Sequence, residues 1–220
     1  QKNNITAMPN PYFSFKQFTV YHDRCAMKVG TDGVLLGAWT DVSGARDILD
    51  IGTGTGLIAL MLAQRSEAHI MAVDIDEDAV KQAKENVEKS PWPGRIEVER
   101  HDFCCFNSDI RYDVIVSNPP YFFNSLKCPD GQRNIARHTV GLDFESLIDS
   151  CGRLLSPSGR FSVIIPTDGM DEFMRIASEG GLCLSRRTWI KTKPDAAPKR
   201  VLMEFECGEL FGCGTLPPYI

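Results

Sequence analysis

Residues 47–65 constrain the fold of this chain most, because they combine a strand, a glycine-rich turn and a helix. The apolar run at 47–51 is typical of a buried strand, and we expect a helix over 56–65. Gly52, Gly54 and Gly56 form a G-x-G-x-G turn between them. Glycines let the backbone turn sharply and let a ligand approach it closely. The segment therefore predicts a βα unit whose turn can hold a ligand.

The residues around this turn indicate the kind of ligand. The spacing differs from the G-x-G-x-x-G of dinucleotide sites, and no Gly-Lys-Ser/Thr ending marks a phosphate loop. Asp50 lies just before the glycines, and a carboxylate there suits a cationic amino-acid end better than a pyrophosphate. A glycine turn alone remains a weak indication of a nucleotide-type ligand.

Two further acids end predicted strands. Asp74 closes the run 70–74, 22 residues after Gly52, which is the distance at which an acid can hold ribose hydroxyls. Asp102 ends the next strand, where it can accept a hydrogen bond from an adenine amino group. The alternative is that an acid here only caps the helix predicted from residue 77, and we expect Asp76 to do so.

The strand predicted at 112–117 runs into Asn118-Pro119-Pro120-Tyr121. Two prolines fix the backbone and remove two N–H donors, so the turn is rigid and its carbonyls stay unpaired. The Asn118 side chain and the Pro119 carbonyl can each accept one N–H of a planar NH2 group, while Tyr121 stacks on the attached ring. We therefore expect these four residues to be catalytic. The alternative is an ordinary strand end stopped by proline.

The remaining pattern predicts an α/β fold. Phe13, Phe15, Phe18 and Val20 alternate as in a short hairpin, and an apolar helix is expected within 25–39. Further helices are expected at 77–89, 144–155 and 168–179, and further strands at 95–100, 159–165, 182–190 and 200–207. Strands that alternate with helices before a final strand pair predict a doubly wound, mostly parallel sheet with an antiparallel terminal hairpin. On the helix 77–89, the expected i,i+4 ion pairs are Glu77–Lys81 and Glu85–Lys89.

Composition points to one large domain of a cytoplasmic enzyme. The 220 residues include no run of 18 apolar residues and no charged-then-apolar leader, so we expect no membrane span. The eight cysteines are scattered without a C-x-x-C pair, so we expect free thiols and no metal site.

The net charge of −5 argues against a generally basic nucleic-acid binder, but basic residues cluster locally. Phosphate contacts need local rather than global positive charge. One cluster comprises Arg186, Arg187, Lys191, Lys193, Lys199 and Arg200, and a second comprises Lys127, Arg133, Arg137 and His138. The alternative is a solvated face with a mobile loop. The residues that we expect to bind substrate are Tyr121, Arg133, Arg137, His138, Arg186, Arg187 and Lys199.

Three segments carry a resemblance to a known family. They are residues 13–18 (Phe-Ser-Phe-Lys-Gln-Phe), the long string 23–39 with Lys-Val-Gly-Thr-Asp-Gly at its centre, and residues 132–138. With the glycine turn, they resemble the bacterial tRNA1(Val) adenine-N6 methyltransferases of the class I S-adenosylmethionine-dependent superfamily. The likeness runs from Phe13 to Cys207, after which the family's closing strand and aromatic-rich tail have no clear counterpart.

The resemblance implies a Rossmann-like, seven-stranded class I methyltransferase domain at 41–220, preceded by a segment, 1–40, that packs on the cofactor site. It implies S-adenosylmethionine as cofactor, S-adenosylhomocysteine as product, and methylation at N6 of the adenosine just 3′ of the anticodon in a valine tRNA. The protein is expected to be a monomer or a weak homodimer. The implied cofactor-binding residues are Thr31, Asp32, Asp50, Gly52, Gly54, Gly56, Asp74, Ile75, Asp102, Phe103 and Asn118.

Three other functions remain open on the sequence. A protein glutamine N5-methyltransferase also acts on a planar NH2 group, and a guanine-N2 rRNA methyltransferase uses a related turn. A catalytically silent S-adenosylmethionine-binding module is the third alternative, although the intact Asn118, Tyr121 and Asp50 count against it.

Overall fold

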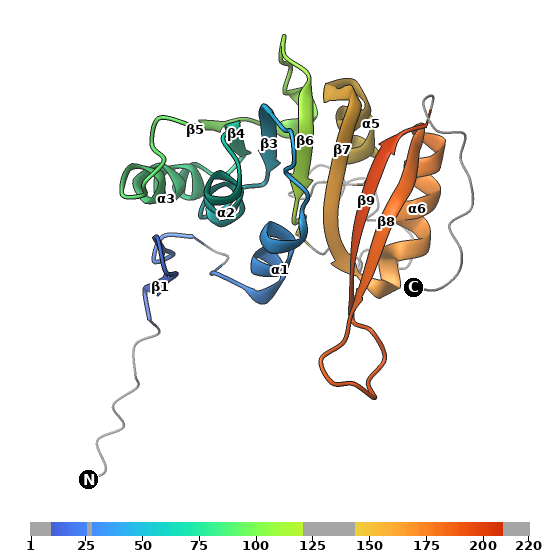
Figure 1. Cartoon of the computed structure of the whole chain (residues 1–220), viewed down its shortest axis with the longest axis horizontal. Helices are drawn as coiled ribbons and strands as arrows, with labels where there is room; N and C mark the ends of the chain where they lie inside the picture. Colours follow the sequence, from blue (N-terminus) through green and yellow to red (C-terminus); the bar gives the residue numbers. More distant parts are fainter. Residues whose placement is uncertain (1–9, 26–27, 121–143, 209–220) are drawn as a thin grey trace, which may run out of the picture.

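The computed structural model describes residues 10–25, 28–120 and 144–208, and these form a seven-stranded sheet with helices on both faces (Figure 1). The strand order is β5-β4-β3-β6-β7-β9-β8. The strands are β3 (Asp47–Ile51), β4 (His69–Asp74), β5 (Ile96–Arg100), β6 (Tyr112–Ser117), β7 (Leu155–Pro166), β8 (Leu182–Ile190) and β9 (Arg200–Cys207). Strands β3 to β7 are parallel, and β9 runs antiparallel to both β7 and β8. The predicted sheet with its terminal hairpin is confirmed.

Helices cover the sheet in two layers. They are α1 (Thr31–Trp39), α2 (Leu57–Arg65), α3 (Glu77–Glu88), α5 (Phe144–Leu154) and α6 (Met170–Glu179), with the 3-10 turns η1 (Phe103–Cys105) and η3 (Thr167–Gly169). Ile48 of the central strand β3 joins the core beneath α1, α2 and α3, whereas Leu49 joins the core beneath α5 and α6. Successive strand residues point to opposite faces, so the apolar run of β3 is buried on both sides, as in other parallel sheets.

A separate two-stranded sheet precedes α1. Its strands β1 (Tyr12–Ser14) and β2 (Thr19–Tyr21) pair antiparallel, which confirms the predicted hairpin. Val20 is fully buried in the same core as Leu36 and α2. The hairpin therefore packs against the layer formed by α1, α2 and α3. A division of the chain at residue 40 stays a prediction.

The element bounds differ from expectation at β7. The strand begins at Leu155 rather than at residue 159, and its register against β6 shifts between Tyr112 and Val114. At Gly159 an added Cβ would lie 2.8 Å from the Tyr112 carbonyl oxygen, so only glycine fits this close approach of the two strands.

Local predictions on α3 are confirmed in part. Asp76 caps the helix by accepting the Asp78 N–H at 2.9 Å, and Lys81 pairs with Glu77 at 2.7 Å. The expected Glu85–Lys89 pair is wrong. Glu85 instead binds Arg24 at 2.6 Å, and the Lys89 ammonium lies 4.4 Å from the centre of the Tyr21 ring.

The cysteines are also mostly as expected. Cys25, Cys104, Cys105, Cys151 and Cys207 form no disulfide. Cys183 is disulfide-bonded, so the expectation of free thiols is wrong at that residue. Within the described ranges, no helix has the length and apolar character needed to cross a membrane, and no cluster of three or more His, Cys, Asp or Glu side chains is arranged to hold a metal.

Candidate functional site

Four neighbouring parallel strands bring the predicted residues to one edge of the sheet. Ile51, the last residue of β3, pairs with Val73 of β4 and with Ser117 of β6, and Asp74 pairs with Arg100 of β5. Parallel neighbours lie about 4.8 Å apart, so the residues that follow these strand ends line up along the edge. In spatial order they are Asp102, Asp74, Gly52 and Asn118.

The glycine turn lies at the centre of this edge. Gly52, Gly54 and Gly56 have φ values of 68°, 55° and 79°, a region that side-chain-bearing residues rarely adopt. An added Cβ at Gly56 would lie 3.3 Å from Ala83, so this glycine allows α2 to pack on α3. An added Cβ at Gly52 or Gly54 would meet nothing within 4 Å. These two glycines therefore present bare backbone to open space, where a ligand can approach.

Asp50 lies fully buried beneath the turn. Its Oδ2 accepts hydrogen bonds from Thr53 Oγ1 at 2.7 Å and from the Ala59 N–H at 3.1 Å. Its Oδ1 is buried without a hydrogen-bond partner among the described residues. Burial raises the pKa of Asp50 to about 7, because desolvation disfavours the charged form. A cation bound at the turn would place a positive charge near Asp50 and so favour its ionised form.

Asp74 is oriented by the backbone on both of its oxygens. The Gly54 N–H donates to Oδ2 at 2.8 Å, and the Asp76 N–H donates to Oδ1 at 3.0 Å. A carboxylate oxygen can accept a second hydrogen bond, so the group remains able to bind a pair of hydroxyls. The adjacent Ile75 is 60% exposed and places an apolar side chain beside this carboxylate.

Asp102 and Phe103 follow β5 at the far end of the row. The exposed Asp102 caps η1 by accepting the Cys104 N–H at 3.0 Å. Phe103 is 4% exposed, and its ring packs in the core beneath α5 and α6. Asp102 is thus the member of this pair whose side chain can reach a ligand at the edge.

The end of β6 is fastened to the end of β3. Ser117 Oγ donates to the Ile51 carbonyl at 3.1 Å, directly before the glycine turn. Asn118 is half-buried, Pro119 is buried and Pro120 is exposed. Asn118 and the Pro119 carbonyl are therefore held next to the turn. The predicted residues Tyr121, Arg133, Arg137 and His138 lie outside the described residues.

The start of α1 is joined to the terminal hairpin. Arg200 Nε donates to Asp32 Oδ2 at 2.8 Å, which ties the first turn of the helix to the first residue of β9. Arg200 is also the β9 residue that pairs with Pro166, the last residue of β7. Asp32 therefore lies at the same edge of the sheet as the carboxyl ends of the parallel strands. Thr31 beside it is exposed.

The basic cluster on β8 and β9 divides into two kinds of side chain. The Arg186 guanidinium lies 3.8 Å from the centre of the Trp39 ring and donates to Glu204 Oε2 at 2.9 Å. Glu204 is 5% exposed, so Arg186 neutralises a buried carboxylate in addition to any contact with substrate. Lys199 is exposed, and Arg187 lies 5.1 Å from the centre of the Trp189 ring. Sequence reasoning missed the contact between Arg186 and Trp39, because 147 positions separate them.

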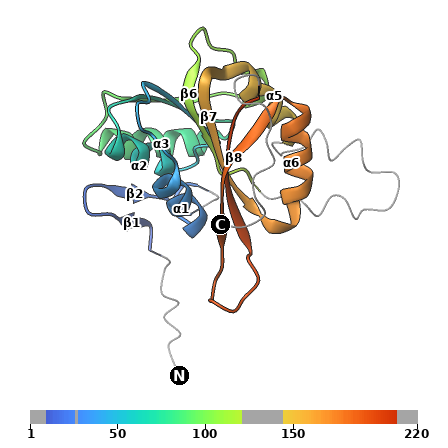
Figure 2. The same ribbon diagram turned by 45° about the vertical axis from the view of Figure 1, so that its right-hand side comes forward.

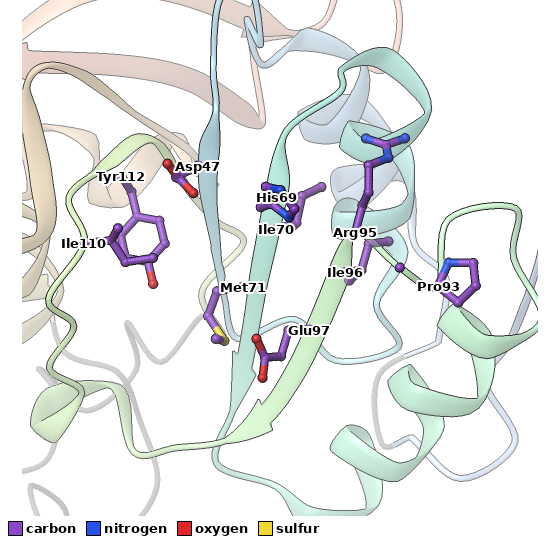
Figure 3. A pocket seen from close by; sticks show the side chains of 11 residues that line it. Asp47, His69, Ile70, Met71, Pro93, Arg95, Ile96, Glu97, Ile110 and Tyr112 are labelled. Carbon is purple, nitrogen blue, oxygen red and sulfur yellow. The ribbon is translucent and has the colours of Figure 1, made fainter.

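A hollow at the opposite edge of the sheet contains none of the predicted residues (Figure 3). Asp47, His69, Ile96 and Tyr112, which line it, are the first residues of β3, β4, β5 and β6. Ligands of open α/β sheets bind at the carboxyl ends of the strands, so the candidate site is the row that contains the glycine turn.

Comparisons with known proteins identify the family. A family model, the methyltransferase small domain, matches residues 29–167. A curated protein of Phocaeicola vulgatus, named tRNA1(Val) (adenine(37)-N6)-methyltransferase, is 68% identical over 199 residues, 90% of this chain and 85% of that protein. The chain belongs to this family. A Bacteroides fragilis protein with the same name is 58% identical over 201 residues, with the same shares covered.

Solved structures match the methyltransferase fold at low identity. A TehB-like SAM-dependent methyltransferase from Corynebacterium glutamicum aligns with a TM-score of 0.56 and 20% identity over 83% of this chain and 90% of its own. The glycopeptide N-methyltransferase MtfA, complexed with S-adenosyl-L-methionine, aligns with a TM-score of 0.60 and 14% identity over 82% and 89% of the two chains. At these identities the likeness shows the fold alone, which this chain shares with these methyltransferases.

Proposed function

We propose that the protein transfers a methyl group from S-adenosylmethionine to N6 of the adenosine just 3′ of the anticodon, position 37, in tRNA1(Val). The register of β3 and β6 carries the proposal, because Ile51 pairs with Ser117 and so places Asn118 beside the glycine turn. A methyl donor at the turn and an amine at Asn118 would then be neighbours. Relatives that are 58% and 68% identical, named for this reaction, support the choice of substrate.

The chain's own residues fit S-adenosylmethionine, which supplies a methyl group on a positively charged sulfur. The unpaired Oδ1 of buried Asp50 and the bare backbone at Gly52 and Gly54 suit the cationic amino-acid end of this cofactor. Asp74 is aligned to accept from ribose hydroxyls. Ile75 offers an apolar surface for the adenine ring, and Asp102 accepts from its amino group. Thr31, Asp32, Gly56 and Phe103 support this site from α1, α2 and η1.

Asn118 and Pro119 perform the chemistry on the substrate amine. The lone pair of an exocyclic adenine nitrogen is delocalised into the ring, so the nitrogen is a poor nucleophile. When its two N–H groups donate to Asn118 Oδ1 and to the Pro119 carbonyl, the nitrogen becomes more pyramidal and its lone pair more available. A bound S-adenosylmethionine would supply the methyl group that bonds to this nitrogen as its bond to sulfur breaks, and the amine proton would leave to solvent after the transfer, so no residue is assigned as a general base. Tyr121 stacks on the base, and Pro120 keeps the turn rigid.

Basic side chains hold the tRNA. Arg187 and Lys199 of the terminal hairpin supply positive charge for backbone phosphates, and the sequence assigns the same role to Arg133, Arg137 and His138. An adenosine in a loop can be turned outward more cheaply than a paired one, because less stacking and pairing is lost.

The decisive test offers tritiated S-adenosylmethionine with total tRNA that lacks the modification and, in parallel reactions, with rRNA and with total protein, followed by nucleoside and amino-acid analysis. We expect the label in N6-methyladenosine at position 37 of tRNA1(Val). Label in protein would identify a glutamine methyltransferase, and label in N2-methylguanosine of rRNA would identify a guanine methyltransferase. Cofactor binding without transfer to any of these substrates would identify a silent module. Each of these three outcomes contradicts the proposal.

A further inference from the structure

One face of the β1–β2 hairpin carries polar and aromatic side chains that the proposed reaction does not use. Tyr12 pairs with Tyr21 across the two strands, and Ser14 pairs with Thr19. Cross-strand partners project from the same face of a sheet, and the Ser14 and Thr19 hydroxyls lie 3.1 Å apart. We call these four residues the outer face of the hairpin.

The opposite face anchors the hairpin to the protein. Val20 is fully buried, the Phe15 and Phe18 rings stack with centroids 4.7 Å apart, and Phe18 meets Trp92 edge-on at 5.7 Å. Because this apolar face is used by the core, the outer face points away from it. Tyr12 is 42% exposed there, so its ring is accessible to a ligand.

Two lysines lie close to the outer face. Lys16 and Lys89 line the same hollow as Thr19 and Tyr21. The Lys89 ammonium lies 4.4 Å from the centre of the Tyr21 ring. Neither lysine forms an ion pair within the part of the chain that the structure describes. Exposed aromatic rings beside unpaired cations are the combination that binds single-stranded nucleic acid, since bases stack on the rings and phosphates pair with the cations.

The hairpin is also coupled to the candidate site. The Asn86 side chain of α3 accepts the Tyr21 N–H at 2.9 Å and donates to the Tyr21 carbonyl at 2.8 Å. The same side chain donates to the carbonyl of Thr55, inside the glycine turn, at 2.8 Å. One buried amide therefore fixes the hairpin relative to the turn, and Figure 2 shows β1 and β2 beside α1 and below α2 and α3.

We propose that the outer face, together with Lys16 and Lys89, binds an unpaired segment of the RNA substrate. Tyr12 stacks on a base, and the two lysines hold the phosphates on either side of it. The inference rests on the proposed function and adds to it a second RNA contact, far in sequence from the terminal hairpin with Arg187 and Lys199.

Binding of unmodified tRNA to the whole chain, measured by fluorescence anisotropy with S-adenosylhomocysteine present, tests this surface. Tyr12→Ala should weaken binding about 5- to 100-fold, as expected when one base loses its stacking partner, and Tyr12→Phe should bind like the parent protein. A double change, Lys16→Ala with Lys89→Ala, should weaken binding and reduce the slope of log affinity against log salt by about 2. The matched control, Lys81→Ala with Lys84→Ala, removes two exposed lysines of α3 and should stay within about twofold of the parent.

Melting temperature and S-adenosylhomocysteine affinity show that each variant is folded. If Tyr12→Ala and the Lys16/Lys89 variant bind tRNA as the parent does, the outer face does not bind RNA and the inference is wrong. If the Lys81/Lys84 control loses as much affinity as the Lys16/Lys89 variant, the effect is one of general charge and the inference also fails. Methyl transfer to tRNA by the parent protein is measured separately, so failure of this inference leaves the proposed function standing.

Discussion

The Asp74 carboxylate holds the middle glycine of the turn, since the Gly54 N–H donates to its Oδ2 at 2.8 Å. The last residue of β4 thereby fixes the turn that follows β3 while its remaining lone pairs face the edge of the sheet. In the proposed site, Asp74 would therefore link the binding of a ribose to the shape of the glycine turn.

Asp74→Ala should weaken S-adenosylmethionine binding by about 1.5–3 kcal/mol, because two charge-assisted hydrogen bonds to ribose hydroxyls are lost. Isothermal titration calorimetry measures the affinity. Asp78→Ala removes a nearby exposed carboxylate of α3 and serves as the control for charge. Equal affinity in Asp74→Ala and the parent protein would remove Asp74 from the site.

Asn118→Ala should lower turnover at least about 100-fold while cofactor affinity stays nearly unchanged, since the lost contact strengthens only in the transition state. Single-turnover methylation of tRNA measures the chemical step apart from product release. Asn118→Asp keeps an acceptor oxygen at the same place and should retain more activity than Asn118→Ala. A loss of less than about fivefold in Asn118→Ala would refute the assigned role.

Asp50 should make stability depend on pH. Its pKa is about 7 in the folded protein and 3.8 ordinarily. Between about pH 4 and pH 7 the folded state keeps a proton on Asp50 that the unfolded state has lost. The protonated, neutral Asp50 therefore contributes stability that is complete below about pH 4 and is lost as the pH rises through about 7. Urea unfolding measures this effect. From pH 5 to pH 8 the free energy of unfolding of the parent should fall by about 1–3 kcal/mol more than that of Asp50→Asn, whose amide does not titrate. The same difference at both pH values would show that Asp50 does not carry a raised pKa.

Ligand binding should reverse part of this shift. S-adenosylmethionine carries an ammonium and a sulfonium, and positive charge near Asp50 favours its carboxylate form. Binding at pH 6 should therefore release a proton, and binding at pH 8 should release less. Calorimetry in two buffers of different ionisation enthalpy measures the number released, and Asp50→Asn should abolish the proton release at pH 6.

The sequence predicted the row of strand ends well because each signal there is local. Asp50, Asp74 and Asn118 stand next to apolar runs whose length marks a strand, and parallel strands bring their carboxyl ends to one edge. The cap at Asp76 and the Glu77–Lys81 pair were predicted for the same reason, since their spacing is that of one helical turn.

Contacts between distant segments could not be predicted. The i,i+4 spacing predicted that Glu85 binds Lys89, but Glu85 forms its ion pair with Arg24, which is 61 residues away in the sequence. Arg186 looked like a free phosphate ligand in the sequence, although the fold stacks it on Trp39. Such pairings depend on which elements the fold places side by side, and spacing along the chain does not encode this.

Arg186 and Arg187 are neighbours in sequence, yet their substitutions should differ. Glu204 is 5% exposed and is bound by Arg186, so Arg186→Ala leaves a buried carboxylate without its cation. The Arg186 side chain is itself 40% exposed, which screens the pair. We therefore expect a loss of about 1–3 kcal/mol in the free energy of unfolding, less than for a fully buried pair. Arg186→Lys should recover little of it, because lysine lacks the planar fork that stacks on Trp39.

Arg187→Ala and Lys199→Ala should instead leave the free energy of unfolding within about 0.5 kcal/mol of the parent. Both should weaken tRNA binding and reduce its salt slope by about 1 each, since each loses one phosphate contact. Urea unfolding and tRNA anisotropy, measured on the same preparations, separate the two kinds of residue. If Arg187→Ala unfolds the protein as readily as Arg186→Ala, or if Lys199→Ala leaves the salt slope unchanged, the terminal hairpin does not hold the tRNA in the way proposed.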